Sequence, residues 1–160
     1  MPIAVAIVED NPDYRMGISY VLRASPGVSV LGEYATAEAF LEALPSAPPD
    51  VVLMDLGLPG LTGVQAIERL RALAPHVQPI VLSVHEDDDH VFRAVCAGAV
   101  GYLTKPVMPD ALLEAIEAAF GGGTPMSPHI ARRVLEMFRK HAPPPHADYD
   151  LTTREVDVLE

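Results

Sequence analysis

The sequence is poor in cysteine, in basic residues and in long apolar runs. Cys96 is the single cysteine, so no disulfide can form within the chain. It lies in the helix-like run VFRAVCAGA, where we expect a small buried side chain. No apolar run approaches the roughly 20 residues of a membrane-spanning helix, and the beginning MPIAVAIVED lacks a basic signal segment. We therefore expect a cytoplasmic protein with no membrane contact.

The charge of the chain is strongly acidic. It has 11 Lys and Arg against 22 Asp and Glu, which gives a formal net charge of -11 at pH 7. A chain of this charge repels phosphate backbones, so nucleic-acid binding would need a local basic patch that the composition does not show. The length of 160 residues, 49% of them hydrophobic, fits one globular domain and a smaller additional segment.

Two hydrophobic periodicities alternate along most of the chain. Apolar β-branched runs typical of strands occupy residues 3–8, 28–34, 51–55, 79–84 and 101–104. Apolar residues at helical spacing follow them, as Val64, Ile67 and Leu70 do after the third run. Parallel strands need long crossover connections, which these helices provide. We therefore predict an α/β fold, a five-stranded parallel sheet that is doubly wound, with helices on both faces.

The chain changes character after this alternation. Ser127 and Pro128 are residue types favoured at the N-cap and first turn of a helix, here a C-terminal connector helix. Its apolar stripe consists of Ile130, Val134, Met137 and Phe138. A proline-rich linker follows, and a capping-box spacing then begins another helix. We predict a domain at 1–122, the connector helix and linker at 123–149, and the start of a further helical unit at 150–160.

Polar side chains follow four of the predicted strands. Glu9 and Asp10 end the first strand, Asp55 the third, Ser83 the fourth and Lys105 the fifth. The carboxyl ends of parallel strands meet at one edge of the sheet, where open α/β folds bind their ligands. Each residue alone has an ordinary explanation, such as an acid that complements a helix dipole. Their occurrence together at the ends of four of the five strands predicts a binding site.

The chemistry of these residues favours a magnesium ion and a phosphoryl group. Carboxylates that lie close together repel one another unless a cation joins them, and Mg²⁺ prefers carboxylates, waters and phosphate oxygens. A phosphoryl group would then lie beside Asp55, with Lys105 as a compact charge for one oxygen and Ser83 as a donor to another. Pro106 after the lysine permits a cis peptide bond that would direct the lysine inward.

Four segments resemble, in order and spacing, the receiver domain of bacterial two-component response regulators. They are VAIVEDNPDYR, VVLMDLGLPGLTGVQ, IVLSV and GAVGYLTKP. The resemblance covers residues 3–121 and implies the flavodoxin-like strand order 2-1-3-4-5. It also implies that a sensor histidine kinase is the partner that supplies the phosphoryl group.

The resemblance implies roles for individual residues. Asp55 would be the phosphoacceptor, and Lys105 would contact its phosphoryl group. Glu9, Asp10 and Asp55 would hold Mg²⁺, and the backbone carbonyl of Gly57 would complete the metal site. A phosphohydrolase with an aspartyl nucleophile would carry a second acid where Gly57 stands, so turnover of external substrates is the less favoured alternative.

The same resemblance implies a conformational switch. Ser83 matches the hydroxyl that moves toward the phosphoryl group, and Tyr102 matches the aromatic residue whose rotamer follows it. His85, two residues after Ser83, would border the site and influence the rate of dephosphorylation. The run HEDDDH, 85–90, has a metal-ligand composition, but we favour an acidic helix start with solvated histidines.

The connector and residues 150–160 resemble the LuxR/NarL/FixJ-type subgroup, whose effector is a helix-turn-helix DNA-binding domain. These residues match only the opening of the first effector helix, so DNA contact would need effector helices that are missing after Glu160. The connector stripe would pack within the chain or form a homodimer with a second copy. We expect a phosphorelay response regulator that controls transcription, with a stand-alone receiver acting through protein–protein contacts as an alternative.

Overall fold

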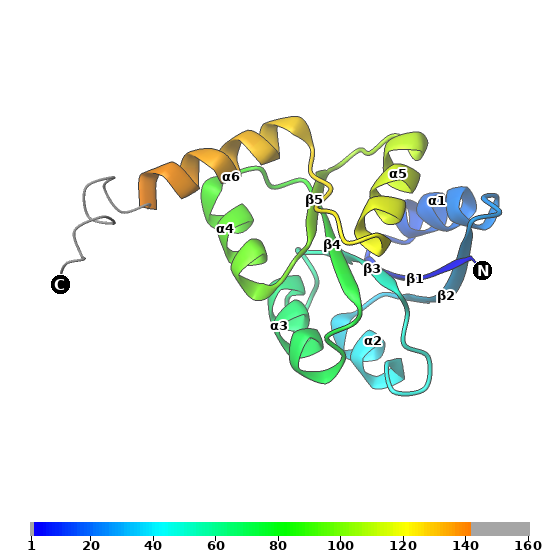
Figure 1. The fold of residues 1–160 in the computed structure, drawn as a ribbon. Helices are drawn as coiled ribbons and strands as arrows, with labels where there is room; N and C mark the ends of the chain where they lie inside the picture. The colour runs from blue at the N-terminus through cyan, green and yellow to red at the C-terminus, as the bar shows by residue number, and fades with distance from the viewer. Residues whose placement is uncertain (1, 142–160) are drawn as a thin grey trace.

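A five-stranded parallel sheet lies between two layers of helices (Figure 1). The computed structural model describes residues 2–141, so the proline-rich linker and the helix start at 150–160 lie outside the described residues. The strands are β1 (Ile3–Val8), β2 (Val28–Tyr34), β3 (Val51–Asp55), β4 (Gln78–Ser83) and β5 (Gly101–Thr104). The helices are α1 (Pro12–Arg23), α2 (Ala37–Ala43), α3 (Gly63–Leu73), α4 (Asp88–Ala97), α5 (Pro109–Phe120) and α6 (Pro128–His141).

The sheet has the predicted order β2-β1-β3-β4-β5, with every neighbouring pair parallel. Four strands have the predicted bounds, whereas the fourth begins and ends one residue earlier than predicted. Val84, assigned to the strand from its apolar character, lies past the end of β4 and is 67% exposed. The strand ends at Ser83 because the chain there turns toward α4.

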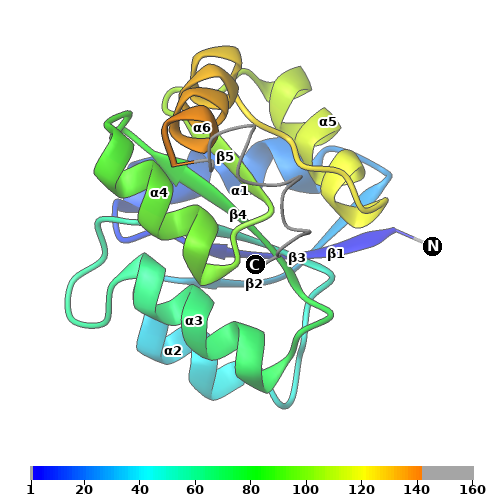
Figure 2. The same ribbon diagram turned by 60° about the vertical axis from the view of Figure 1, so that its left-hand side comes forward.

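Separate hydrophobic cores form on the two faces of the sheet. Figure 2 shows α1 and α5 on one side of the strands and α2 and α3 on the other. α1 and α5 cover one face, where Leu22 and Ile116 are fully buried. α2, α3 and α4 cover the other, with Phe40, Ile67 and Val91 against the strands. Each large apolar side chain buried in this way stabilises the fold by about 1.5–3 kcal/mol. The sheet is thus apolar on both faces, and polar side chains gather at its edge.

The chain after α5 returns to the sheet beside β5. The N–H of Tyr102 donates to the carbonyl of Pro125 at 3.0 Å, and the N–H of Ser127 donates to the carbonyl of Tyr102 at 3.1 Å. The N–H of Thr104 donates to Ser127 Oγ at 3.1 Å. These bonds satisfy backbone groups on the outer edge of β5. They also fix the point from which α6 begins.

α6 begins at Pro128, as predicted, and packs on α4 (Figure 1). Ile130 and Met137 are buried in the same core as Val91 of α4. Phe138, which the sequence pattern places in the same stripe, is 73% exposed, so it does not pack within the chain. The helix turns by about 100° per residue, so a residue one position after Met137 is carried off the buried face. The boundary at 122/123 stays a prediction, although α6 shares the core of the preceding residues.

Cys96 corrects another expectation. It is exposed on α4, because the buried positions of that helix are Val91, Ala94 and Ala97, three residues apart, and Cys96 falls outside this stripe. None of the helices described over residues 2–141 combines the length and apolar composition that a bilayer span requires.

Candidate functional site

The acidic side chains at the ends of β1 and β3 come together at the carboxyl edge of the sheet. Glu9 and Asp55 are 2% and 8% exposed, and Asp10 is exposed beside them. Each of these residues offers a carboxylate oxygen, and the oxygens lie within 4.8 Å of one another. Oxygen atoms at such spacing are the donor set that a hard divalent cation takes. The residues therefore fit a magnesium ion.

Lys105, at the end of β5, joins two of these acids. Its Nζ lies 2.6 Å from Glu9 Oε1 and 3.3 Å from Asp55 Oδ1. The ammonium also lies 4.7 Å from the centre of the Tyr14 ring, a cation–π arrangement. The Lys105–Pro106 peptide bond is cis, as the sequence permits. The lysine thus supplies a positive charge directly beside Asp55.

Burial and charge act against each other on these groups. Burial raises the pKa of Glu9 above its ordinary value, although hydrogen bonds from Lys105 and the Asn11 N–H oppose it. For Lys105 burial acts to lower the pKa, but the hydrogen bond to Glu9 and the charge of Asp55 outweigh it, so its pKa is raised. The lysine is therefore held in its charged form at neutral pH.

The loop after β1 is built to hold Glu9 in place. Its Oε2 accepts the N–H of Asn11 at 3.1 Å, and its carbonyl accepts Arg15 Nη1 at 2.6 Å. Asn11 is also the N-cap of α1, because its side chain accepts the N–H groups of Asp13 and Tyr14. One short segment therefore ends the strand, fixes the acid and begins the helix.

The loop after β3 folds back on Asp55. Thr62, directly before α3, and Gln65, in the first turn of the helix, form a capping box. A Cβ on Gly63 would lie 2.3 Å from the carbonyl oxygen of Asp55 and 2.9 Å from Leu56 Cα. Only glycine allows this approach. The position of Asp55 therefore depends on the first residue of α3.

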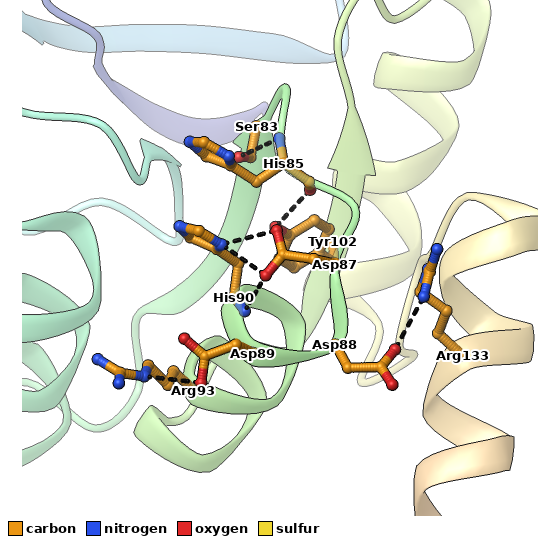
Figure 3. A network of polar contacts seen from close by, with 9 residues as sticks. All are labelled: Ser83, His85, Asp87, Asp88, Asp89, His90, Arg93, Tyr102 and Arg133. Atoms are coloured by element: carbon orange, nitrogen blue, oxygen red, sulfur yellow. Dashed lines mark hydrogen bonds and ion pairs between the residues drawn. The ribbon is translucent and has the colours of Figure 1, made fainter.

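A second polar network lies between β4 and α4 (Figure 3). Ser83 is 1% exposed, and its Oγ accepts the N–H of His85 at 3.0 Å. Tyr102 is fully buried, and its hydroxyl donates to the carbonyl of His85 at 2.8 Å. Burial raises the pKa of Tyr102. The backbone of His85 is thus bonded on both sides to the residues that the sequence assigned to a switch.

The sheet register relates the two networks. Asp55 of β3 pairs with Leu82 of β4, so Ser83 is one residue beyond the partner of Asp55. Ser83 in turn pairs with Thr104, directly before Lys105. The structure therefore brings carboxylate oxygens of Glu9, Asp10 and Asp55 within 4.8 Å of one another and pairs Lys105 with Glu9 and Asp55. It places Ser83 at the same edge of the sheet.

Sequence reasoning missed two contributors to the site. They are Tyr14, whose ring lies under the Lys105 ammonium, and Arg15, which donates to the carbonyl of Glu9. Both follow the Asn11 cap by one turn of α1, which carries them toward the end of β1. The signal that could have found them is the position of the cap itself.

Comparison with known proteins decides the family. Residues 5–117 match the family described as the response regulator receiver domain. This chain belongs to that family. The receiver is similar to the nitrate/nitrite response regulator proteins NarL and NarP of Escherichia coli K12, with 30% and 35% identity over 160 residues. The matches cover 99% of this chain and 74% and 73% of the relatives.

A solved structure agrees with this placement. The receiver resembles a two-component response regulator of the LuxR family from Aurantimonas sp. SI85-9A1, with a TM-score of 0.80 and 33% identity, over 86% of this chain and 98% of that one. The chain is thus a LuxR/NarL-type response regulator receiver of a two-component system, and its family is regulatory rather than metabolic.

Proposed function

We propose that the receiver accepts a phosphoryl group on Asp55 from the phosphohistidine of a sensor histidine kinase. A carboxylate oxygen of Asp55 would attack phosphorus, and the P–N bond of phosphohistidine would break with its electron pair returning to the imidazole. The observation that carries the proposal is that Asp55 lies 3.3 Å from the Lys105 ammonium and has a carboxylate oxygen within 4.8 Å of those of Glu9 and Asp10. Such a cation beside the acceptor would stabilise charge on the transferred group.

Magnesium is the cofactor that this donor set supports. Glu9, Asp10 and Asp55 would hold it through carboxylate oxygens, together with the carbonyl of Gly57. When bound, the ion would neutralise charge on the phosphoryl oxygens. Lys105 would bind a further phosphoryl oxygen, and the Ser83 hydroxyl would donate to another.

The switch would run through the network between β4 and α4. If Ser83 Oγ turns to the phosphoryl group, the N–H of His85 loses its acceptor. The carbonyl of His85 also holds the Tyr102 hydroxyl, so a shift of this residue would disturb the tyrosine. The surface of α4 and α5 would then change. The size of this shift is set by how much more favourably the phosphoryl group interacts with the switched conformation than with the resting one.

Control of transcription is the proposed output. NarL and NarP are named response regulators, and a DNA-binding effector after the receiver would carry the response to promoters. We place this activity in the cytoplasm. A homodimer of the receiver stays a prediction, to be tested by the molar mass in solution with and without a phosphoryl analogue.

The central test is phosphorylation by acetyl phosphate with Mg²⁺, followed by intact-protein mass measurement. Wild type is expected to gain one phosphoryl group, and Asp55→Asn none. Asp110→Asn, at an exposed position of α5, is the matched control and should react like wild type. No gain in wild type, or an equal gain in Asp55→Asn, would overturn the proposal.

A phosphohydrolase of external substrates is the second candidate, because such an enzyme and a receiver both use an aspartyl nucleophile and a magnesium site. Gly57 stands where such an enzyme would need an acid, and a Cβ there would lie 3.9 Å from Asp55 Oδ2. Sustained turnover of a phosphomonoester by the wild type would favour the enzyme.

His85 is proposed to influence the lifetime of phosphorylated Asp55. Its backbone is held by Ser83 and Tyr102, which places it at the start of the loop after β4. The half-life of phosphorylated wild type would be compared with that of His85→Ala. An unchanged half-life would remove this role.

A further inference from the structure

We infer that His85, Asp87 and His90 form a binding site for a divalent transition-metal ion, separate from the acidic site around Asp55. The imidazoles of His85 and His90 stack with ring centres 4.0 Å apart and planes 3° apart. Figure 3 shows both rings on the same side of the loop, with Asp87 pointing toward His90. One ligand atom from each of the three residues lies within 4.8 Å of the others.

The three ligand atoms lie within 4.8 Å of one another, a wider spacing than in a metal centre with its ion bound. Zinc takes nitrogen and oxygen ligands at about 2.0–2.2 Å, which puts neighbouring ligand atoms of a tetrahedral site about 3.3 Å apart. His90 Nδ1 already lies 2.8 Å from both carboxylate oxygens of Asp87. A metal lies in the plane of each imidazole that binds it, so the parallel rings of His85 and His90 would turn out of their stack to share one ion. Solvent would be a further ligand because the group is largely exposed.

The donor atoms select the class of metal. Two imidazoles and one carboxylate suit zinc, copper or nickel, whereas Mg²⁺ prefers oxygen ligands alone. The acidic cluster of Glu9, Asp10 and Asp55 contains only oxygen donors. The two groups should therefore differ in the ions they bind.

The backbone around the three residues is fixed independently of a metal. His85 is bonded through its N–H to Ser83 and through its carbonyl to Tyr102. Asp87 is the N-cap of α4, since its side chain accepts the N–H of His90 at 3.2 Å. Ligands on a preorganised backbone lose less entropy when they bind an ion. A bound metal would restrain the loop that links Ser83 to α4.

Neighbouring charges do not occupy the site. Arg93 pairs with Asp89 at 3.2 Å, and Arg133 of α6 pairs with Asp88 at 2.9 Å. The two other acids at the beginning of α4 are therefore paired with arginines, and Figure 3 shows Asp88 on the side of the helix that faces Arg133, away from the stacked rings. Glu86, between His85 and Asp87 in the sequence, lies 3.2 Å from His129 Nε2, which leaves Asp87 as the acid that faces the imidazoles.

The test is isothermal titration of the protein with zinc in saturating Mg²⁺, in a Cys96→Ser background that removes the exposed thiol. One zinc per chain is expected for this protein, and binding at least about tenfold weaker for His85→Ala and for His90→Ala. Asp87→Asn should also weaken binding while it keeps a residue suited to the N-cap. Circular dichroism would verify that each variant folds.

Two controls locate the ion. His76→Ala removes an exposed histidine elsewhere, and Asp55→Asn alters the acidic site; both should bind zinc as the background protein does. As a readout independent of heat, Co²⁺ should broaden the NMR signals of residues 85–90 before those of residues 9–10. The inference is overturned if the background protein binds no zinc, if His85→Ala and His90→Ala keep its affinity, or if Asp55→Asn abolishes binding.

Discussion

The ammonium of Lys105 lies closer to Glu9, at 2.6 Å, than to Asp55, at 3.3 Å. The side chains of Lys105 and Glu9 are 14% and 3% exposed, so their attraction is only weakly screened by water. The lysine therefore already neutralises part of the acidic cluster before any metal arrives. It competes with a divalent ion for the same carboxylates.

This competition predicts that Lys105→Met strengthens Mg²⁺ binding. Removing a positive charge leaves the carboxylates more negative, and a gain of about 1.4 kcal/mol, or tenfold in affinity, is a conservative expectation. The chain has no tryptophan, so calorimetry is the direct measurement. Lys140→Met, on exposed α6, makes the same change in charge and should leave Mg²⁺ affinity as it was. Equal or weaker binding by Lys105→Met would contradict the competition.

Tyr102→Phe tests the bond between the buried tyrosine and the loop. The substitution removes the donor to the His85 carbonyl, so the free energy of unfolding should fall by about 1 kcal/mol. Urea denaturation measures it. Tyr20→Phe is the control, because it removes the same hydroxyl group from a side chain that is 78% exposed to solvent. A loss that is no larger for Tyr102→Phe than for Tyr20→Phe would show that the bond contributes nothing to stability.

The sheet and its polar edge could be predicted from the sequence because both depend on local patterns. Continuous apolar runs fix the strands, and an acid or lysine directly after a run falls at the strand end whatever the rest of the chain does. The packing of α6 on α4, the exposure of Cys96 and the place of Tyr14 beneath Lys105 depend on which elements meet in space. Helical periodicity identifies an apolar stripe but not its width or its partner, so it does not show that Phe138 is exposed beside the buried Met137.

Ile130→Ala tests whether α6 is part of the folded receiver. Ile130 is fully buried in the core shared with α4, so its truncation should lower the free energy of unfolding by about 2–4 kcal/mol. Leu135→Ala, at a position of the same helix that is 56% exposed, should cost no more than about 0.5 kcal/mol. Urea denaturation of the two variants, each made in the full chain, gives the two changes in the free energy of unfolding. Equal effects would mean that α6 does not pack as described.

Gly63→Ala tests the support behind Asp55. The added methyl group would meet the carbonyl oxygen of Asp55 at 2.3 Å, so the backbone has to move and both stability and phosphorylation should fall. We expect a loss of about 1–3 kcal/mol in the free energy of unfolding. Gly17→Ala, inside α1, is the control, because a Cβ added there would have no other atom within 4 Å. This variant should raise the free energy of unfolding by about 0.5–1 kcal/mol. Unimpaired phosphorylation of Gly63→Ala would show that the close approach is dispensable.

The bond between Glu33 and Ser19 should make stability depend on pH. Ser19 Oγ donates to Glu33 Oε2 at 2.7 Å, and this bond, with the charge of Arg23, lowers the pKa of Glu33 from its ordinary 4.5. The unfolded chain binds the proton more readily than the folded one. The stabilisation is therefore fully present above pH 4.5 and is lost as the pH falls through the lower pKa of the folded state.

Glu33→Gln isolates this contribution, because the amide keeps an acceptor for Ser19 but loses the charge. At neutral pH the variant should be less stable than wild type by about 1 kcal/mol, and the difference should shrink as the pH is lowered through the acid range. Urea denaturation at several pH values measures both curves. Glu114→Gln, on the exposed face of α5, removes an equal charge without this bond and should lie near wild type throughout. If the Glu33→Gln difference stayed constant with pH, it would arise from packing and not from the carboxylate charge.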